Sequence, residues 1–279
     1  MNWNINLIII LFIIVTLSFF AFYNGLVIRQ YTIKTTNISP NKPIKIVLIT
    51  DLHSCIYGTE QSELIDKVKN LNADIILLAG DIADDVTPID GTRLFLEGLV
   101  DEVPMYYVSG NHEYWSDQMD DIKSVLRDYG VIVLEDEYKE IEINNSKFII
   151  AGVDDPEWVK YDDRPGSAEE SIEVAFKNLE AKDGFKVLLA HRPEMIGIYK
   201  KYPFDLVVSG HAHGGQVRIP FIINGLYAPN QGWFPPYAGG EYKHGNLTHI
   251  VSRGLSYNPN LPRIFNPPEI VVINIEHAK

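Results

Sequence analysis

The chain has 279 residues, and 24 Lys and Arg against 37 Asp and Glu give it a formal net charge of −13. So acidic a chain lacks the basic surface with which proteins hold duplex nucleic acid, and we expect no nucleic-acid partner. A hydrophobic content of 46% allows a sizeable core, and the single cysteine, Cys55, excludes an internal disulfide and a cysteine-based zinc site.

The first 28 residues carry no charged side chain, and Leu7–Ile28 is an almost continuous apolar run. A helix of that length would rise ~33 Å, more than the ~30 Å of a bilayer's hydrocarbon core. A cleaved signal peptide is the main alternative, but no Lys or Arg precedes the run and no small-residue cleavage site follows it. A buried core helix is a weaker alternative. We therefore predict an N-terminal transmembrane anchor at residues 1–28.

A basic linker is expected next, at residues 29–43, which contain Lys and Arg but no acidic residue. The positive-inside rule then places the rest of the chain on the cytoplasmic face of the cell membrane. The alternative is a solvated linker whose basic side chains have no such role.

From residue 44 onward, short β-rich runs alternate with amphipathic stretches. Ile44–Thr50 and Asp74–Ala79 are apolar almost throughout, as expected of strands that are covered on both faces. Further strands are expected at Met105–Ser109, Val131–Leu134, Glu140–Ile143, Lys147–Ala151, Lys186–Ala190, Leu206–Ser209, His249–Ser252 and Ile270–Ile275. Apolar residues at helical spacing predict helices at Glu60–Leu71, Thr92–Val100, Trp115–Tyr129 and Ser167–Leu179. The pattern indicates one α/β domain over residues 44–279, with two layered sheets and helices outside them.

Metal-binding side chains follow directly after five of these strands. The five turns are Asp51-Leu52-His53, Gly80-Asp81, Gly110-Asn111-His112-Glu113, His191 and Gly210-His211-Ala212-His213. Ligands gather outside the carboxyl ends of strands in open α/β sheets, so these turns are expected to meet at one crevice. Each turn alone has an ordinary structural explanation, such as a capping Asp or a buried structural histidine. Five of them in this order indicate a metal centre.

These turns resemble, motif by motif, the calcineurin-like metallophosphoesterases, over roughly Ile44–Ile275. The resemblance implies a four-layer α/β sandwich, in which two central mixed β-sheets are flanked by helices, and two divalent metal ions at the sheet edge. One ion would be held by Asp51, His53, Asp81 and His213, and the other by Asp81, Asn111, His191 and His211. Asp81 would then bridge the two ions.

The ligand types fit the chemistry of this family. Carboxylate and amide oxygens mixed with imidazoles suit Mn²⁺ best, with Fe or Zn²⁺ as alternatives. In the family a hydroxide held by the two metals attacks phosphorus in line. His112 matches a residue that stabilises the transition state or protonates the leaving oxygen, and Asp84 matches the carboxylate that orients it. We expect Asp85, the competing carboxylate, to be solvated.

A narrower resemblance lies in the Gly-, Pro- and Asn-rich region Gly214–Pro268, which we expect to form long loops over the site. His211–Pro220 and Asn230–Phe234 are similar to the membrane-anchored bacterial branch of the superfamily, which includes phosphodiesterases and enzymes resembling the UDP-2,3-diacylglucosamine hydrolases of lipid A biosynthesis. On this resemblance Trp233 and Tyr237 would contact acyl chains, while Arg192 would meet a phosphate. The alternative is that the aromatic residues only pack the loops against the body.

The sequence thus predicts a monomeric phosphoesterase with two metal ions that hydrolyses a phosphodiester or pyrophosphate bond. The substrate is expected to be a phosphate ester, lipid-linked in the manner of UDP-2,3-diacylglucosamine. A phosphoprotein or wall-polymer phosphatase is an alternative function, and a non-catalytic scaffold of the same fold is a weaker one.

Overall fold

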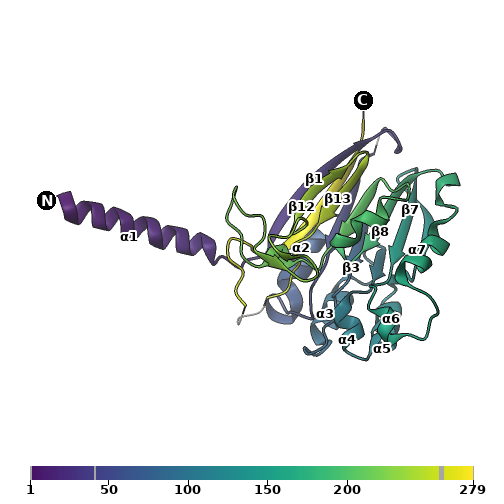
Figure 1. Ribbon diagram of the computed structural model, residues 1–279, viewed down its shortest axis with the longest axis horizontal. Coiled ribbons are helices and arrows are strands. Elements are labelled where there is room, and N and C mark those ends of the chain that lie inside the picture. The colour runs from purple at the N-terminus through teal and green to yellow at the C-terminus, as the bar shows by residue number, and fades with distance from the viewer. Residues whose placement is uncertain (1, 41, 258–260, 279) are drawn as a thin grey trace.

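Two six-stranded sheets lie face to face in a computed structural model of the protein, which describes residues 2–40, 42–257 and 261–278 and only the backbone of residues 2–5 (Figure 1). The first sheet has the strand order β1 (Val27–Thr35), β14 (Glu269–His277), β2 (Ile44–Ile49), β3 (Ile75–Ala79), β4 (Met105–Val108), β5 (Ile132–Val133). The second has the order β12 (Gly240–His244), β13 (Leu247–Val251), β9 (Leu206–Ser209), β8 (Phe185–Ala190), β7 (Ser146–Val153), β6 (Glu137–Ile143). A two-stranded ribbon joins β10 (Tyr227–Ala228) to β11 (Gly232–Trp233).

Both large sheets are mixed, as the resemblance implied. Strands β2, β3, β4 and β5 run parallel, whereas β14 is antiparallel to β2. In the second sheet β7, β8, β9 and β13 run parallel, with β6 and β12 antiparallel at the two edges. The parallel strands bring their carboxyl ends to the same side of each sheet, which is where the metal-binding turns begin.

Three layers of apolar contact hold the sheets and helices together. Side chains from the facing surfaces of the two sheets, such as Leu48, Leu77, Ile150 and Leu189, form the central core. The outer face of the first sheet packs on α2 (Ser62–Leu71), α3 (Asp90–Leu99) and α5 (Met119–Asp128). The outer face of the second sheet packs on α7 (Ala168–Phe176) and α8 (Ile196–Tyr199). Strands buried on both faces explain why β2, β3, β8 and β9 read as continuous apolar runs. The four layers therefore follow the predicted order of helices, sheet, sheet and helices.

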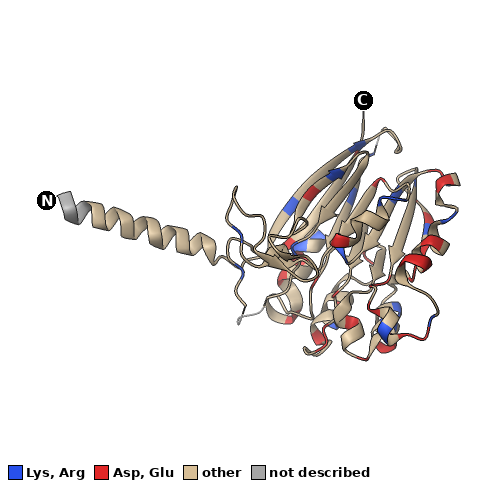
Figure 2. Ribbon diagram, in the orientation of Figure 1, with Lys and Arg blue, Asp and Glu red and all other residues tan. Residues whose placement is uncertain are grey.

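The prediction of a transmembrane helix is wrong. No helix in the described part of the chain is long and apolar enough to span a bilayer. The apolar run is divided: α1 (Asn2–Ala21) ends at Ala21, the turn residues Asn24 and Gly25 follow, and Val27 begins β1. The apolar part of the helix, residues 7–21, rises ~22 Å, which is less than the ~30 Å hydrocarbon thickness. The predicted anchoring through this helix, and the single-pass placement on the cytoplasmic face that depended on it, are therefore wrong as well. Figure 2 shows that the charged residues lie on the body, and the described residues of α1 include none.

Other elements differ from the sequence expectation in ways that concern the site. Much of the expected linker at 29–43 belongs to β1, which pairs in parallel with β14 and forms an edge of the first sheet. The expected helix Trp115–Tyr129 corresponds to the shorter α5, and a separate one-turn helix, α4 (Asn111–Trp115), precedes it with Asn111 and His112 at its start. A further short helix, α6 (Trp158–Tyr161), precedes α7. The loops expected over Gly214–Pro268 contain β10, β11 and β12 in addition to β13, which matches the strand expected at His249–Ser252. Residues 258–260 lie outside the described part.

Candidate metal centre

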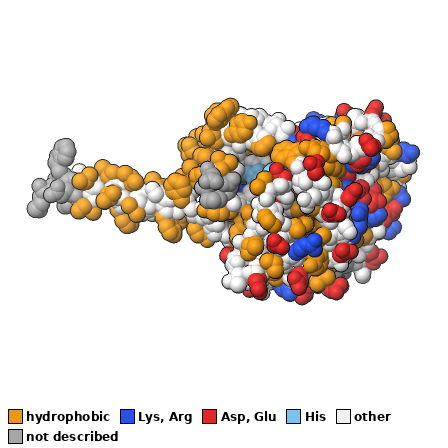
Figure 3. Space-filling model, turned by 90° about the horizontal axis from the view of Figure 1, so that it is seen from below, with side chains coloured by type: hydrophobic (Ala, Val, Ile, Leu, Met, Phe, Trp, Pro, Cys, Tyr) orange, Lys and Arg blue, Asp and Glu red, His pale blue; other side chains and the backbone are white. Residues whose placement is uncertain are grey.

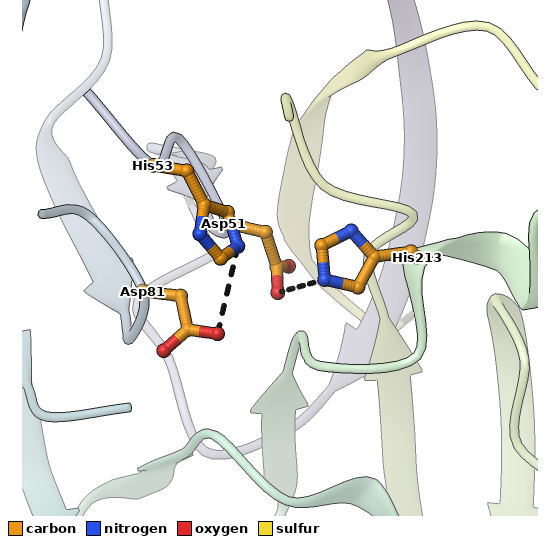
Figure 4. Close-up of side chains that lie close together, drawn as sticks. All are labelled: Asp51, His53, Asp81 and His213. Atoms are coloured by element: carbon orange, nitrogen blue, oxygen red, sulfur yellow. Dashed lines mark ion pairs between the residues drawn. The ribbon is translucent and has the colours of Figure 1, made fainter. Parts of the chain in front are cut away.

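Two buried carboxylates, Asp51 after β2 and Asp81 after β3, form the centre of the site (Figure 4). Each uses one oxygen to accept a backbone N–H from another turn. Asp51 Oδ1 accepts from His211 N–H at 2.9 Å, and Asp81 Oδ1 accepts from His112 N–H at 2.9 Å. The other oxygen of each, Oδ2, is buried and has no hydrogen-bond partner among the described residues. Buried polar atoms are rarely left unpaired, so two such oxygens together are best explained by a cation.

The turns approach the carboxylates so closely that only glycine fits at two positions. A Cβ at Gly110 would collide with Asp81 Oδ1, and a Cβ at Gly210 would lie 2.5 Å from Asp51 Oδ2. Glycine is therefore needed at these two positions because it leaves space for a charged side chain close to the backbone. The backbone angle is not the reason.

Four histidines surround these carboxylates, and one ring nitrogen of each has a fixed partner. His53 Nδ1–H donates to Asp84 Oδ1 at 2.9 Å, and His191 Nδ1–H donates to the carbonyl oxygen of Ala79 at 2.9 Å. His213 Nδ1 lies 2.7 Å from Ser256 Oγ. The partner of His211 is at its other nitrogen, where Nε2 lies 2.8 Å from Asn230 Oδ1. A metal-binding imidazole ordinarily has such a partner, because the partner selects the tautomer.

The second ring nitrogen of three of these histidines faces a carboxylate. His191 Nε2 lies 3.1 Å from Asp81 Oδ2, and His53 Nε2 lies 3.6 Å from the same oxygen. His213 Nε2 lies 3.6 Å from Asp51 Oδ1 (Figure 4). Ligand atoms of Asp51, His53, Asp81 and His213 lie within 4.8 Å of one another, as do those of Asp81, His191 and His211. Asn111 is buried beside them, and its Oδ1 has no hydrogen-bond partner in the described chain.

Burial and mutual charge set the protonation of this cluster. Burial raises the pKa of Asp81, but the positive charge of His191 and the other neighbouring imidazoles outweighs it and holds the pKa well below its usual range. Burial lowers the pKa of His191, whereas the charge of Asp81 raises it, and the result is about 10. Burial holds the pKa values of His211 and His213 well below the usual range, which keeps both rings neutral. Neutral imidazole is the form that binds a metal ion.

His112 stands beside the cluster and is bound by two carboxylates. Its Nδ1 lies 2.7 Å from Asp85 Oδ1, a hydrogen bond, and 3.0 Å from Asp84 Oδ1. Burial lowers the pKa of His112, but Asp84, Asp81 and Asp85 together raise it to about 9. Asp84 also binds His53, so it links the two rings, as the sequence suggested for one of them. Asp85 is exposed, as we expected, and it is also the nearer partner of His112.

Glu113 holds the turns in place, a role that the sequence motif did not reveal. The side chain is completely buried. Its Oε2 accepts N–H groups from Gly110 at 2.9 Å and Asp81 at 3.0 Å, and its Oε1 accepts N–H groups from Ile82 at 2.7 Å and Ala83 at 3.2 Å. One carboxylate therefore joins the turn after β3 to the turn after β4. The feature of the sequence that could have indicated this role is the position of the glutamate, directly after the Asn-His pair.

A cavity of about 620 Å³ opens above the cluster. His53, Asp84, Asp85, His112 and His213 line one part of it, and Cys55, Val86, Tyr227, Pro229, Tyr257 and Leu261 are among the residues that line the rest. Figure 3 shows histidine side chains in a hollow, with hydrophobic side chains around it.

The three residues expected to bind substrate do not line this cavity in the described structure. Arg192 is buried, and its guanidinium is paired with both oxygens of Asp155, at 2.5 and 3.0 Å. Trp233 is exposed and packs its ring edge-on against Tyr227, with the ring centroids 5.5 Å apart. Tyr237 is half-buried and is held through its backbone by the Gln231 side chain. Trp233 thus contacts Tyr227, which lines the cavity, but does not line the cavity itself.

The fold and the cluster together define an α/β protein with a candidate metal centre, and comparison with known proteins identifies its family. The sequence model of the calcineurin-like phosphoesterases matches residues 44–215. An uncharacterized metallophosphoesterase of Aquifex aeolicus is 30% identical over 253 residues, which cover 89% of this chain and 91% of the relative. One from Helicobacter pylori is 30% identical over 265 residues, covering 91% of this chain and 66% of the relative.

Solved structures show the same fold at low sequence identity. The NAD nucleotidase of Haemophilus influenzae superposes with a TM-score of 0.52 at 16% identity, over 77% of this chain and 46% of that one. A dimetal phosphatase from Danio rerio gives 0.50 at 11% identity, over 84% and 93%. The chain belongs to the calcineurin-like metallophosphoesterases and is a metal-dependent phosphohydrolase.

Proposed function

We propose that the protein hydrolyses a phosphodiester or pyrophosphate bond at a centre of two divalent metal ions. Asp51, His53, Asp81 and His213 would hold one ion, and Asp81, Asn111, His191 and His211 the other. The observation that carries this proposal is the set of buried ligand atoms that have no hydrogen-bond partner outside the cluster in the described chain: Oδ2 of Asp51 and Asp81, Oδ1 of Asn111, and Nε2 of His53 and His191. All five belong to the two proposed ligand sets, which combine oxygen and imidazole donors and suit Mn²⁺, with Fe or Zn²⁺ as alternatives.

When bound, the two ions would lower the pKa of a water molecule and neutralise charge on the phosphoryl oxygens. The residues of the chain perform the remaining work. His112 borders the cavity, and its Nδ1 is held by Asp85 and Asp84, so its Nε2 is the nitrogen left to donate to a phosphoryl or leaving oxygen. Asp84 orients both this ring and that of His53. This arrangement supports an assignment of His112 and Asp84 as catalytic and positioning residues, respectively.

The cavity lining supports a substrate with an apolar portion. Beyond the histidines, Val86, Tyr227, Tyr257 and Leu261 border the cavity, and all four are exposed. Solvent-exposed apolar side chains around a polar catalytic floor are typical of a site whose ligand covers them. A lipid-linked nucleotide sugar of the UDP-2,3-diacylglucosamine type combines a phosphate linkage with acyl chains, and we propose this substrate class.

The test is a substrate panel with Mn²⁺, in which kcat/KM is measured for a simple phosphodiester, a phosphomonoester, UDP-2,3-diacylglucosamine and its deacylated counterpart. We expect the diester to exceed the monoester and the acylated sugar to exceed the deacylated one. Val86→Ser should reduce kcat/KM for the acylated substrate only, whereas Val174→Ser, an exposed substitution on α7 outside this cavity, should change neither. A preference for monoesters would instead favour a phosphatase, and equal rates with and without acyl chains would contradict an apolar subsite.

A further inference from the structure

The ribbon of β10 and β11 places Asn230 against one of the proposed metal ligands. Asn230 lies between the two strands of the ribbon, and its Oδ1 is 2.8 Å from His211 Nε2. The same oxygen accepts a hydrogen bond from Arg192 Nη1 at 2.6 Å. No other described residue offers an acceptor to the His211 ring.

Arg192 determines which way the Asn230 amide faces. A guanidinium is a donor at every nitrogen, so the atom of Asn230 that meets it must be the amide oxygen and not the NH₂ group. Arg192 is itself fixed, because it is buried and both oxygens of Asp155 accept from its Nε and Nη2. Asp155 is also buried, so the chain from Asp155 through Arg192 to Asn230 has little freedom.

The fixed amide oxygen in turn selects the tautomer of His211. If Nε2 carried no proton, its lone pair would face that of Asn230 Oδ1 across 2.8 Å, which is repulsive. Nη1 of Arg192 also lies within hydrogen-bond distance of Nε2, at 3.1 Å, and as a donor it favours the opposite tautomer. The contact with Asn230 Oδ1 is shorter, at 2.8 Å, and Nη1 already donates to that oxygen, so the geometry favours a proton on Nε2. The lone pair of the ring is then on Nδ1, and this nitrogen would bind an ion shared with Asp81 and His191, which form a candidate ligand group with His211.

We infer that Asn230 is a positioning residue that holds His211 in the tautomer able to bind metal through Nδ1, and that Arg192 and Asp155 hold Asn230 for this task. This inference rests on the proposed metal centre. It also gives Arg192 a role different from phosphate binding, because each of its three side-chain nitrogens already donates to Asp155 or Asn230. In His53, His191 and His213 the hydrogen-bonded nitrogen is Nδ1, which leaves Nε2 for a metal ion. His211 would differ from them by binding the metal through Nδ1.

The first test needs no metal. In metal-free protein, long-range ¹H–¹⁵N NMR of the histidine rings reports which nitrogen is protonated, and we expect His211 to be protonated at Nε2. Asn230→Leu removes the acceptor at similar size and should give a mixture of tautomers. Asn230→Asp keeps an acceptor beside Arg192 and should preserve the Nε2–H form. A wild-type ring protonated at Nδ1, or a tautomer unchanged in Asn230→Leu, would overturn the inference.

The second test measures Mn²⁺ binding by titration calorimetry. Loss of an orienting partner ordinarily weakens metal binding about 10–100-fold, and we expect this loss at one of two sites in Asn230→Leu but not in Asn230→Asp. Asn70→Leu, on the exposed surface of α2, is the matched control and should bind as the wild type does. Equal affinity in Asn230→Leu and the wild type would refute the positioning role. If the wild type itself binds no metal, the proposed centre fails, whereas the NMR result still decides the tautomer separately.

Discussion

Glu113→Gln is expected to be among the most damaging conservative substitutions in the protein. The Glu113 carboxylate accepts four backbone N–H groups, two at each oxygen, and lies completely buried. An amide has one oxygen, so it can accept from only one of the two pairs. Its NH₂ group would then face the other pair, donor against donor, with no water to replace the lost acceptor.

The cost follows from the number of N–H groups left without an acceptor. Each buried unpaired donor costs about 1–3 kcal/mol, so two of them give about 2–6 kcal/mol. The net stability of a domain is only about 5–15 kcal/mol, so this substitution removes a large part of it. Because Asp81 N–H is one of the four donors, the turn that carries Asp81 should also become less ordered.

Urea unfolding followed by circular dichroism measures this free energy directly. Glu97→Gln, an exposed substitution on α3, is the control and should stay within about 0.5 kcal/mol of the wild type. A Glu113→Gln protein as stable as that control would refute the reasoning, since it would mean that the four hydrogen bonds contribute nothing net. A protein that fails to fold would agree with the upper end of the range.

Three further predictions concern the metal centre and one buried histidine. Asp81→Asn should lower the metal content per chain, measured by elemental analysis. Removing the metal from the wild type with EDTA should abolish hydrolysis until Mn²⁺ is restored. Full activity of the Asp81→Asn protein or of the EDTA-treated wild type would contradict the proposed metal centre. His112→Ala should lose about 10²–10⁴-fold in kcat while keeping its metal content, because general-acid catalysis contributes that much, and loss of the metals instead would make His112 a ligand. Burial lowers the pKa of His249 to about 3, so its folded pKa lies below the unfolded value near 6.5, and the neutral ring contributes stability that is lost as pH falls through that interval. His249→Gln should therefore lose less unfolding free energy than the wild type between pH 7 and pH 4, by up to about 3 kcal/mol; parallel pH curves would contradict this.

The strands and turns of the site could be predicted because their signals are local. An apolar run buried on both faces, as in β2 or β3, ends where the first ligand begins, so the pattern and the chemistry lie within ten residues of each other. The N-terminal run could not be assigned in the same way. A long apolar helix and a shorter helix followed by a strand have similar composition. Whether residues 27–35 form a helix or a strand depends on pairing with β14, which lies at the other end of the sequence.

Neighbours in sequence were a poor guide to the partners of charged side chains. Arg192 follows His191, yet its guanidinium meets Asp155 and Asn230, residues on different loops. Asp84 and Asp85 are adjacent and alike, and only the folded turn shows that both reach His112. Contacts of this kind depend on how the loops of two sheets meet, which no spacing rule encodes.

Backbone geometry gives a reason to regard the metal centre as formed by the fold itself. Five proposed ligands have left-handed backbone angles: Asp51 (φ 50°), His53 (φ 48°), Asp81 (φ 53°), His211 (φ 66°) and His213 (φ 47°). This conformation costs of order 1–3 kcal/mol for a residue with a side chain and persists only where its surroundings enforce it. Here adjacent turns enforce it: Asp51 N–H donates to the Gly80 carbonyl at 3.0 Å, and His53 N–H donates to the Asp81 carbonyl at 2.9 Å. The side chain of Glu113 fixes Asp81 from the other side. The ligands are therefore held in a costly conformation by contacts that need no metal, and most of the ordering of the site is achieved on folding.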